Sequence, residues 1–554
     1  MRLLHLCRAA PSPRGGYLMA AGGVAAGDVV SVLGAAPLPN LTGIDAVLVD
    51  GHPEPRPAAE LNALAALVEE GASLVAVGAA PHAHDDFWTR LLGVVATDPL
   101  PDGEYFAKLA GDRALTRRLE TEWAVQDRVE TLAIVAGTAE PVLVVNIGYR
   151  DHVVVTVAHR GRGRVVTSGL GLSEAAWASL PLRALLRRAL APAHPASDRD
   201  LGLAVVGYGP FGGMGYLHAS AARAVPGLDI VAVLDPSDAR RKAAEADWAG
   251  VRAYETLPEL LADDGVDVAV VATPPSSHAQ LAEALLTAGK HVVAEKPLCL
   301  TVSEADRLIA LAADRHLTLT VHQNRRWDQD FLALRRAVDG GLLGELFNVE
   351  TFVGSFEHPC RHWHSEQSVS GGAVYDWGSH HVDWILQLYG TPPARVTAHG
   401  HKRVWHDVTN LDQMRLRMEW PDGREAQFVV SDVAGIRPPK FYLQGTRGTL
   451  AGHYRERVFE RIEPGRGFVR EPAHHAEAPV ELDLARYESG YGLISSRLPL
   501  AKEQRFGFHR NLADHLHLGD PLAVTPQSVR QVIAVLEAAQ LSATSGGRPV
   551  DVPQ

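Results

Sequence analysis

A glycine-rich turn between a buried strand and a helix constrains the fold of this chain more than any other feature. The stretch LGLAVVGYGPFGGMGYLHASAARAV, residues 201–225, spaces Gly207, Gly209 and Gly212 as Gly-x-Gly-x-x-Gly. Glycines at this spacing allow a tight turn and let a pyrophosphate approach the backbone at the helix N-terminus. The next strand-like run, DIVAVLD, ends at Asp235, where a carboxylate can hold the hydroxyls of a ribose. The sequence therefore predicts a dinucleotide site, with NAD favoured over NADP.

Two arginines leave the choice of cofactor open. Arg240 and Arg241 lie one helical turn beyond Asp235. A guanidinium at such a position can bind the 2′-phosphate that distinguishes NADP from NAD. NADP therefore remains an alternative cofactor.

The alternation of strand-like and helix-like runs predicts how the chain divides into domains. Apolar runs such as DAVLVDG and VDVAVVATP alternate with amphipathic helical runs, a pattern typical of doubly wound parallel sheets in α/β proteins. From about Leu346, longer runs of alternating polarity predict an open, mainly antiparallel sheet in an α+β domain. The segment APAHPASDRD is rich in proline and alanine, which is typical of a linker. We expect domains over residues 1–190, 201–325 and 326–554, with the linker over 191–200.

Charge and cysteine content narrow the class of protein. The formal net charge is −12 over 554 residues, which gives no overall attraction to nucleic acid or to anionic membranes. Cys7, Cys299 and Cys360 are widely spaced and odd in number, which argues against a disulfide framework and fits a reducing compartment. No apolar run approaches the length of a membrane span. We expect a cytoplasmic protein that acts on a small molecule, with neither nucleic acid nor membrane as a partner.

The segment GGAVYDWGSHHVDWILQLYG, residues 371–390, predicts a helix with two distinct faces. Apolar periodicity predicts a stripe facing the core; it contains Trp377, His381, Trp384 and Leu388. The other stripe contains Asp376, His380, Asp383 and Gln387. Asp376 and His380 are four residues apart, so their side chains lie one above the other. An acid and a base on one face indicate either a buried structural pair or groups that face a cleft.

Motifs downstream of the glycine-rich turn resemble those of the Gfo/Idh/MocA family of nicotinamide-dependent sugar and polyol oxidoreductases. The matching motifs, in order, are Thr273-Pro274-Pro275 with His278, Glu295-Lys296-Pro297, NRRWD at 324–328, and Asp-x-Gly-x-His-x-x-Asp at 376–383. The closing helical segment LEAAQLSATSG is also similar, and the resemblance covers roughly residues 200–554. It implies a Rossmann domain, a site between two domains, and an open C-terminal sheet that forms contacts in a homo-oligomer.

The resemblance places the catalytic positions at Lys296, Asp376 and His380. Oxidation of a secondary alcohol removes the hydroxyl proton while hydride leaves the same carbon, and His380 can take that proton near neutral pH. We expect Asp376 to orient the imidazole and favour its charged form, and Lys296 to stabilise the developing alkoxide. The cofactor is expected to contact Gly207, Gly209, Gly212, Gly213, Met214, Asp235, Thr273, Pro274, His278, Glu295 and Lys296. The substrate is expected to contact Lys296, Arg325, Arg361, Trp363, Asp376 and His380.

The glycine-rich turn departs from the usual spacing of that family. Members commonly place the last glycine three residues before a histidine in the first helix, and Gly215 and His218 keep that spacing here. On this alignment Pro210 replaces the first glycine. Either the turn carries three extra residues, or a different set of glycines surrounds the pyrophosphate.

The cluster HPCRHWH, residues 358–364, raises the question of a metal. Cys360, His362 and His364 would share one face of a strand, and thiolate and imidazole groups bind zinc. Neither a fourth ligand nor a constrained spacing accompanies them, so we expect no metal. We expect this loop to border the cleft, with Arg361 and Trp363 near a sugar or polyol.

The first 190 residues resemble ThuA-like domains, which have the flavodoxin-like fold of class I glutamine amidotransferases. The matching segments are DAVLVDGHPE, EEGASLVAVGAAPHAHDDFWTRLLG and GRGRVVTSGLG. Amidotransferases need a nucleophile on the sharp turn after the third strand, and this turn reads Val77-Gly78-Ala79-Ala80. We therefore expect no amide hydrolysis, but a domain that binds a sugar or a partner. Its candidate polar residues are Asp50, His52, His82, His84 and Asp85.

Three functions are compatible with this sequence. The leading interpretation is an NAD(P)-dependent oxidoreductase that acts on a secondary alcohol of a sugar, glycoside or cyclitol. The alternatives are an NAD-using glycosidase without net redox change and a non-catalytic sugar or nucleotide sensor. Net reduction of the cofactor separates the first function from the second. The presence of Lys296, Asp376 and His380 together argues against the sensor.

Overall fold

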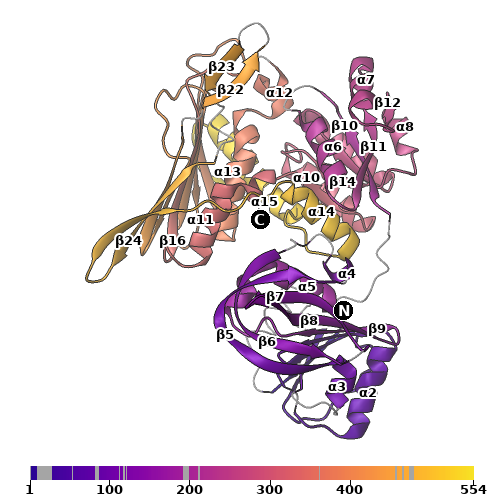
Figure 1. Cartoon of the computed structure of the whole chain (residues 1–554). Coiled ribbons are helices and arrows are strands. Elements are labelled where there is room, and N and C mark those ends of the chain that lie inside the picture. Colours follow the sequence, from indigo (N-terminus) through magenta and orange to yellow (C-terminus); the bar gives the residue numbers. More distant parts are fainter. Residues whose placement is uncertain are drawn as a thin grey trace. The chain divides into compact units, whose positions relative to one another are not determined.

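The chain forms two compact units, which the computed structural model describes separately. One unit comprises Met1–Asp198 with Asp514–Pro521, and the other Arg199–Ala513 with Leu522–Gln554. Their helices and strands are labelled in Figure 1. The described residues are 2–8, 28–52, 54–81, 87–111, 113–116, 119, 122–135, 137–190, 199–209, 213–360, 362–455, 458–463, 467–472 and 479–553.

The first unit is built on a nine-stranded sheet in the order β2-β1-β3-β4-β9-β8-β7-β5-β6. Its parallel strands are β1 (Leu3–Cys7), β2 (Val29–Leu33), β3 (Ala46–Asp50), β4 (Ser73–Val77) and β9 (Gly163–Ser168). Its antiparallel strands are β5 (Val94–Leu109), β6 (Glu122–Ile134), β7 (Glu140–Ile147) and β8 (Arg150–Arg160). The helices are α2 (Ala58–Glu69), α3 (Phe87–Leu92), α4 (Arg113–Thr116) and α5 (Leu180–Leu190). Strands β1, β3 and β4 are buried along their whole length, as expected for central strands covered on both faces.

The antiparallel half of this sheet differs from the parallel sheet that the sequence predicts. Gly148-Tyr149 alone joins β7 to β8, and Gly161-Arg162 alone joins β8 to β9. Both residues of the first turn have positive φ, 57° at Gly148 and 64° at Tyr149. Two-residue connections of this kind form hairpins, whereas parallel neighbours need a crossover of about a dozen residues or more. The strands themselves were predictable, but the length of their connections sets their direction.

The second unit begins with a six-stranded parallel sheet in the order β12-β11-β10-β13-β14-β15. Its strands are β10 (Leu201–Val206), β11 (Leu228–Leu234), β12 (Arg252–Tyr254), β13 (Val268–Val271), β14 (His291–Ala294) and β15 (Leu319–Val321). The connecting helices are α6 (Met214–Ala224), α7 (Asp238–Asp247), α8 (Leu257–Leu261), α9 (His278–Thr287) and α10 (Val302–Asp314). Counted along the chain, the strand order is 3-2-1-4-5-6, which is the Rossmann order. The order reverses between β10 and β13, so a binding crevice is expected at the carboxyl ends of these two strands.

A second sheet of nine strands follows, in the order β25-β24-β21-β20-β16-β19-β18-β17-β26. Its strands are β16 (Leu346–Gly354), β17 (Arg395–His401), β18 (Gln413–Glu419), β19 (Glu425–Ser431), β20 (Phe441–Gly445), β21 (Gly448–His453), β24 (Glu481–Glu488), β25 (Gly492–Leu498) and β26 (Val550–Asp551). All neighbours pair antiparallel except β16 and β19, which pair parallel. A separate hairpin is formed by β22 (Val458–Glu463) and β23 (Gly467–Pro472). The predicted Rossmann-type sheet and the predicted large antiparallel sheet are therefore both confirmed.

Helix α13 (Ala373–Tyr389) lies within the segment predicted to be helical. Gly372 is its N-cap, and Gly390, with φ of 69°, ends it in the left-handed conformation that glycine adopts most easily. Trp384 stacks on Phe331 at a ring distance of 5.6 Å, which fixes the apolar face of the helix in the core. The other helices after β15 are α11 (Gln329–Asp339), α12 (Gln367–Ser370), α14 (Gly507–Leu518) and α15 (Pro526–Thr544).

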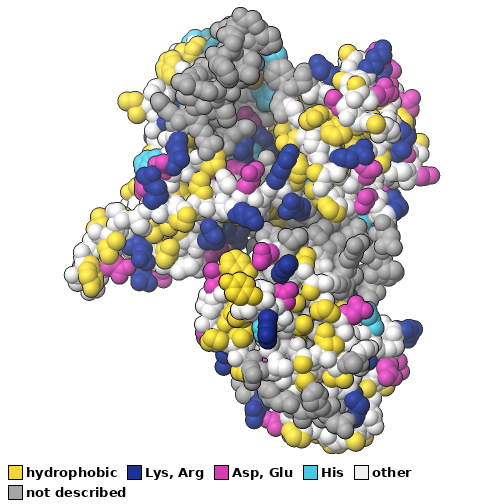
Figure 2. All heavy atoms as spheres, in the orientation of Figure 1, with side chains coloured by type: hydrophobic (Ala, Val, Ile, Leu, Met, Phe, Trp, Pro, Cys, Tyr) yellow, Lys and Arg dark blue, Asp and Glu magenta, His cyan; other side chains and the backbone are white. Residues whose placement is uncertain are grey.

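The surface carries charges of both signs. On the face seen in Figure 2, Lys and Arg side chains are interspersed with Asp and Glu rather than gathered into one basic field. This distribution accords with the formal net charge of −12. Among the described residues, no helix is both long enough and apolar enough to cross a membrane.

Candidate active site

The glycine-rich turn connects the end of β10 to α6. Gly207 has φ of 98°, and a Cβ at this position would lie 2.8 Å from the carbonyl oxygen of Ala272. A Cβ on Gly215 would lie 2.7 Å from the carbonyl oxygen of Gly207. Gly207 therefore supplies the tight turn, and Gly215 allows α6 to pack closely against it. Gly207 and Gly215 are eight residues apart, so the turn is longer than the Gly-x-Gly-x-x-Gly spacing that the resemblance implies.

The middle of the turn leaves space beside the backbone. A Cβ on Gly209 or Gly213 would meet no atom of the described residues within 4 Å. Gly213 is the N-cap of α6 with φ of 62°, and Met214 is the first residue of that helix. Open space at a helix N-terminus suits a pyrophosphate, because the first N–H groups of the helix point into it. Gly212 lies outside the described residues.

Asp235 follows β11 directly and faces the glycine-rich turn. Its Oδ2 accepts a hydrogen bond from the backbone N–H of Tyr208 at 2.8 Å, and its Oδ1 accepts one from Ser237 at 2.9 Å. The guanidinium of Arg241 donates to the backbone carbonyl of Asp235 at 2.9 Å. Arg240 is partly exposed, and its guanidinium makes no hydrogen bond within the described part of the chain. Arg240, rather than Arg241, is therefore the arginine available to a 2′-phosphate.

His278 fastens two turns that border the crevice. Its Nδ1 lies 2.7 Å from the carbonyl oxygen of Pro297, and its Nε2 lies 2.7 Å from that of Thr273. The ring is fully buried, and burial lowers its pKa, while the two carbonyl groups act in the opposite direction. Pro297 follows a cis peptide bond from Lys296. His278 thus links the backbone at Thr273 to the backbone at Pro297, next to the predicted cofactor-binding and catalytic residues.

Lys296 and Asp376 form an ion pair at the carboxyl end of β14. The Nζ of Lys296 donates to the Asp376 carboxylate, and it also donates to the Asp376 backbone carbonyl at 3.1 Å. Both side chains are partly exposed, at 22% for Lys296 and 37% for Asp376. Burial alone would raise the pKa of Asp376, but the charge of Lys296 and its hydrogen bond outweigh burial, so this pKa is lowered. The pair therefore presents one cation and one carboxylate at the crevice.

His380 is oriented by Gln323, not by Asp376. The Nε2 of Gln323 donates to the carbonyl of Ser379 at 2.9 Å, which leaves Oε1 facing the Nδ1 of His380 at 3.0 Å. An amide oxygen only accepts, so the proton of His380 is on Nδ1 and the lone pair is on Nε2. Among the described residues, Nε2 has no hydrogen-bond partner. The expectation that Asp376 orients this imidazole is wrong, because Asp376 turns to Lys296 instead.

Buried surroundings keep His380 neutral. Burial, followed by the positive charges of Lys296 and Arg325, holds the pKa of His380 well below its usual range. The expectation of a favoured imidazolium is therefore also wrong. A neutral imidazole with a lone pair on Nε2 can accept the proton of a bound hydroxyl.

Trp377 lies beside the two cations of the site. Its ring centroid is 6.0 Å from the Nζ of Lys296 and 5.6 Å from the guanidinium carbon of Arg325. The apolar pattern placed Trp377 on the core face, but it is only partly buried, and its neighbours include these charged groups as well as the rings of His380 and His381. The core-facing prediction is confirmed for His381 and Trp384, which are buried. Trp377 gives the site an aromatic wall that periodicity alone did not reveal.

The loop that begins at His358 ends in a short 3-10 turn, Trp363–Ser365, so His362 and His364 do not alternate along a strand. The ring of Trp363 stacks on that of His364 at 3.6 Å. The charges of Asp376 and Lys296 both affect the pKa of His364, which burial lowers, so His364 lies near the ion pair. Cys360, His362 and His364 do not form a metal-ligand group in the described residues. Arg361 lies outside the described residues.

Glu295 belongs to a network with three buried histidines from separate elements, two of which contact its carboxylate. Its Oε1 lies 2.9 Å from the Nε2 of His218 and 2.9 Å from the Nδ1 of His322. The Nδ1 of His218 in turn lies 2.8 Å from the Nε2 of His509. Nitrogens that share a tetrahedral zinc ion lie about 3.3 Å apart, so these shorter distances fit hydrogen bonds. The backbone N–H of Lys296 donates to Oε2 of Glu295 at 3.2 Å, which connects this histidine network to the ion pair.

We expect the histidine network to make the second unit less stable in mild acid. Burial is the main cause that lowers the pKa of His218, and it holds the pKa of His509 well below its usual range. As the pH falls below about 6.5, the unfolded chain binds protons that the folded chain refuses, so the free energy of unfolding falls by up to about 1.4 kcal/mol per pH unit for each histidine. Calorimetry at pH values above and below about 6.5 measures this change in the free energy of unfolding.

The matched variant for that experiment is His509→Gln. A glutamine amide can still donate to the Nδ1 of His218 but does not titrate. We expect the loss of stability between neutral and acidic pH to become shallower in this variant. An unchanged slope would show that His509 is not one of the groups responsible.

Sequence reasoning missed two residues of this site, Gln323 and Trp377. Gln323 immediately precedes the predicted NRRWD segment, and a lone amide carries no signal that separates it from a surface residue. Trp377 sits on the border between the two faces of α13. Its position next to Asp376 in the sequence was the only available indication.

Two family models match the second unit of the chain. The model described as "Oxidoreductase family, NAD-binding Rossmann fold" matches residues 201–323. The model described as "GFO/IDH/MocA C-terminal domain" matches residues 331–451. The first match contains all six strands of the parallel sheet, and the second contains β16 to β20 and most of β21 of the nine-stranded sheet.

Several known proteins are similar to the same region. An uncharacterized oxidoreductase of Schizosaccharomyces pombe is 34% identical over 213 residues, which are 37% of this chain and 58% of the relative. The uncharacterized oxidoreductase YdgJ of Escherichia coli is 31% identical over 264 residues, 47% of this chain and 75% of the relative. The inositol 2-dehydrogenase of Rhizobium meliloti is 29% identical over 285 residues, 50% of this chain and 83% of the relative. The chain thus spans 58% of the length of the first two relatives it matches, both from S. pombe.

A solved structure agrees with these relatives. The NAD-binding protein from Listeria innocua superposes with a TM-score of 0.54 at 29% identity. The superposition covers 64% of this chain and 97% of that protein.

Proposed function

Because the chain belongs to the Gfo/Idh/MocA oxidoreductase family, we propose that it transfers hydride between a nicotinamide dinucleotide and a secondary alcohol carbon of a sugar, glycoside or cyclitol. The observation that carries this proposal is the arrangement of Lys296, Asp376 and His380 at the carboxyl edge of the Rossmann sheet. It combines a cation with a neutral imidazole whose Nε2 has no partner among the described residues. A secondary alcohol needs both groups when its proton and hydride leave together.

The residues at the glycine-rich turn fit a dinucleotide. The open space at Gly209 and Gly213 and the carboxylate of Asp235 suit a pyrophosphate and a ribose respectively. Thr273, Pro274 and His278, with Glu295 and Lys296, would border the nicotinamide half. When bound, the nicotinamide supplies the hydride acceptor or donor. We propose NAD as the cofactor, with NADP as the alternative through Arg240.

Each residue of the site has a distinct role in this proposal. His380 accepts the hydroxyl proton at Nε2, while Gln323 keeps its other nitrogen protonated. Lys296 donates to the substrate oxygen and stabilises the charge that develops there, because a cation in a partly water-excluded crevice acts strongly on an oxyanion. Asp376 positions the Lys296 ammonium. Arg325 and Trp377 form a cationic and an aromatic wall suited to a polyhydroxylated ring.

The substrate class rests on the similarity to an inositol 2-dehydrogenase and on these side chains. We expect NAD⁺ to be reduced when the purified protein is supplied with a panel of sugars, glycosides and inositols, followed by the absorbance of the reduced nicotinamide. Cleavage of a glycoside without net reduction would instead assign the protein to the glycosidase alternative. Activity with NADP⁺ but not with NAD⁺ would assign NADP as the cofactor, with Arg240 as the residue proposed to bind its 2′-phosphate.

For the first unit we propose a ThuA-like domain that binds a sugar or a partner protein. Its parallel strands β2-β1-β3-β4-β9 support a flavodoxin-like arrangement. The turn after β4 has no nucleophilic side chain, so amide hydrolysis by that fold's usual chemistry is not proposed. We also propose that the chain is cytoplasmic and forms a homo-oligomer through its C-terminal sheet. His82, His84 and Asp85 lie outside the described residues.

A further inference from the structure

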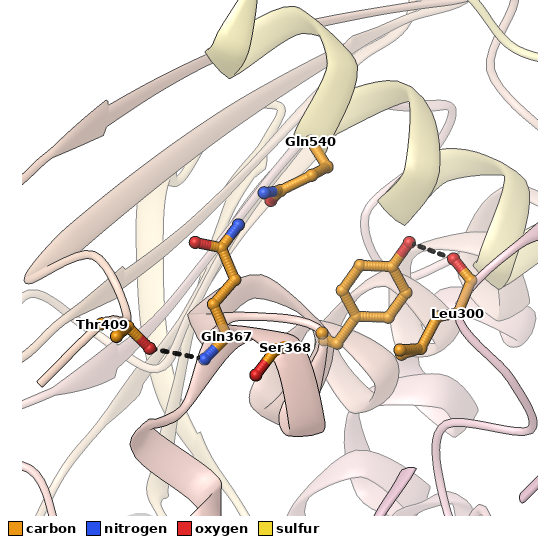
Figure 3. Close-up of a pocket in the computed structure, with 7 residues that line it drawn as sticks. Leu300, Gln367, Ser368, Thr409 and Gln540 are labelled. Atoms are coloured by element: carbon orange, nitrogen blue, oxygen red, sulfur yellow. Dashed lines mark hydrogen bonds between the residues drawn. The ribbon is translucent and has the colours of Figure 1, made fainter. Parts of the chain in front are cut away.

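A second pocket lies at the start of α13, away from the ion pair. It has a volume of about 590 Å³, which is within the range of small-molecule sites. Its lining residues are Leu300, Gln367, Ser368, Gly371, Tyr375, Thr409 and Gln540. They come from the segment after Lys296-Pro297, from α12 and the start of α13, from the loop before β18, and from α15 (Figure 3).

Three polar side chains of this pocket make no hydrogen bond to the described residues. Within the described residues these are the side chains of Gln367, Ser368 and Gln540, and Gln367 is bonded through its backbone alone: its N–H donates to Thr409 at 2.7 Å, and its carbonyl accepts from Gly371 at 2.9 Å. In Figure 3 the amides of Gln367 and Gln540 extend toward the same space. A Cβ on Gly372 would lie 3.6 Å from the Cγ of Gln367 and 3.9 Å from the Oε1 of Gln540, so both side chains meet above this glycine. Two amides therefore converge with donors and acceptors that are available to a ligand.

The composition of the pocket selects a neutral ligand with many hydroxyl groups. No charged side chain is among the described residues that line it, so a phosphate or carboxylate would lose hydration without gaining a counter-ion from them. Amides donate and accept at once, as hydroxyl groups do, and can pair with adjacent hydroxyls on one ring. Leu300 and the ring of Tyr375 supply apolar surface for the C–H faces of such a ring.

The pocket and the candidate active site lie on different sides of α13. Successive residues of a helix are rotated by about 100°, so Tyr375 and Asp376 point in different directions although they are neighbours. Asp376 meets Lys296, whereas the Tyr375 hydroxyl donates to the carbonyl of Leu300 at 2.7 Å. One ligand molecule in the active site would therefore not fill the pocket. The hydrogen bond between Tyr375 and Leu300 does connect the two segments that carry Asp376 and Lys296.

We propose that this pocket is a second binding site, separate from the hydride-transfer site, for a neutral polyol or sugar ring held by the side chains of Gln367 and Gln540. The proposal does not depend on the proposed function, because neither of these residues contacts the ion pair or His380. An occupant would rest on Tyr375 and Leu300, next to the backbone that positions the ion pair.

Saturation-transfer NMR with myo-inositol as the probe tests the site in four forms of the full chain. These are the natural protein, a pocket variant with Gln367→Ala and Gln540→Ala, a cleft variant with Lys296→Ala and Arg325→Ala, and the combination. We expect the cleft variant to retain saturable binding, and the combination to bind at least about tenfold more weakly because two hydrogen-bonding side chains are gone. Gln531→Ala is the matched control, since Gln531 is a partly buried glutamine nine residues earlier on α15.

The outcomes separate the two proposals. Absence of binding in the cleft variant, or binding that the pocket substitutions leave unchanged, would overturn the second site. Absence of turnover by the natural protein on every substrate, together with inositol binding that is intact in the cleft variant, would count against the proposed function and leave the second site supported. Melting temperatures of all four forms show whether each variant is folded before its binding is compared.

Discussion

Replacing Lys296 by alanine is expected to lower kcat/KM by about a thousandfold, because a preorganised donor to a developing oxyanion contributes roughly this much. The substitution also removes the cation that pairs with Asp376. Binding of the reduced cofactor should change by no more than about threefold, since the pyrophosphate and ribose contacts proposed for the glycine-rich turn are untouched. Steady-state rates together with a cofactor titration on the same preparation measure both quantities.

The control for this substitution is Lys242→Ala. Lys242 pairs with Asp238 on the exposed surface of α7 and is remote from the proposed chemistry. We expect its activity to equal that of the natural protein. Full activity in Lys296→Ala would remove Lys296 from the mechanism and with it the main support for the site.

Replacing His380 by asparagine is expected to lower kcat by about a hundredfold to ten-thousandfold, the range attributed to general acid–base catalysis. The asparagine amide can still donate to the Oε1 of Gln323, so the local hydrogen bond survives while the base is lost. Gln323→Leu provides the comparison. This variant keeps the imidazole but removes the amide oxygen that holds the proton on Nδ1. We therefore expect a smaller loss of kcat than in His380→Asn.

The pH dependence of the natural protein gives an independent view of His380. Burial and the charges of Lys296 and Arg325 hold its pKa well below the usual value. A lowered pKa means that the imidazole stays neutral, and able to accept a proton, to lower pH than an ordinary histidine. We therefore expect the acid limb of kcat/KM to lie below pH 6.5, the approximate pKa of an unperturbed histidine. An acid limb at or above that value, together with an active His380→Asn variant, would contradict the assigned role.

The sequence was most informative where local chemistry decides the structure. The buried strand before Gly207 and the helix after the turn follow from periodicity and glycine geometry, and the structure contains both. The span of α13 was predictable because glycines flank an apolar period of about 3.6 residues. Asp235 was found for the same reason, since the end of a parallel strand is a defined place in the sheet.

Tertiary contacts decided what the sequence left uncertain. Whether Asp376 meets His380 or Lys296 depends on where β14 delivers Lys296, which helical spacing does not encode. Gln323 takes the orienting role because the end of β15 lies against α13. In the same way, β16 and β19 pair in parallel inside a mainly antiparallel sheet because of the path of the chain between them, not because of their residue pattern.

The central claim is that the second unit binds a nicotinamide dinucleotide at the turn between Gly207 and Gly215. The most direct test is a titration of the purified chain with NADH and then with NADPH, following energy transfer from its tryptophans to the reduced nicotinamide. The account predicts saturable binding that is tighter for NADH, because the carboxylate of Asp235 favours free ribose hydroxyls over a 2′-phosphate. Absence of saturable binding by either nucleotide would contradict the account and leave the chain as a sensor built on an oxidoreductase fold.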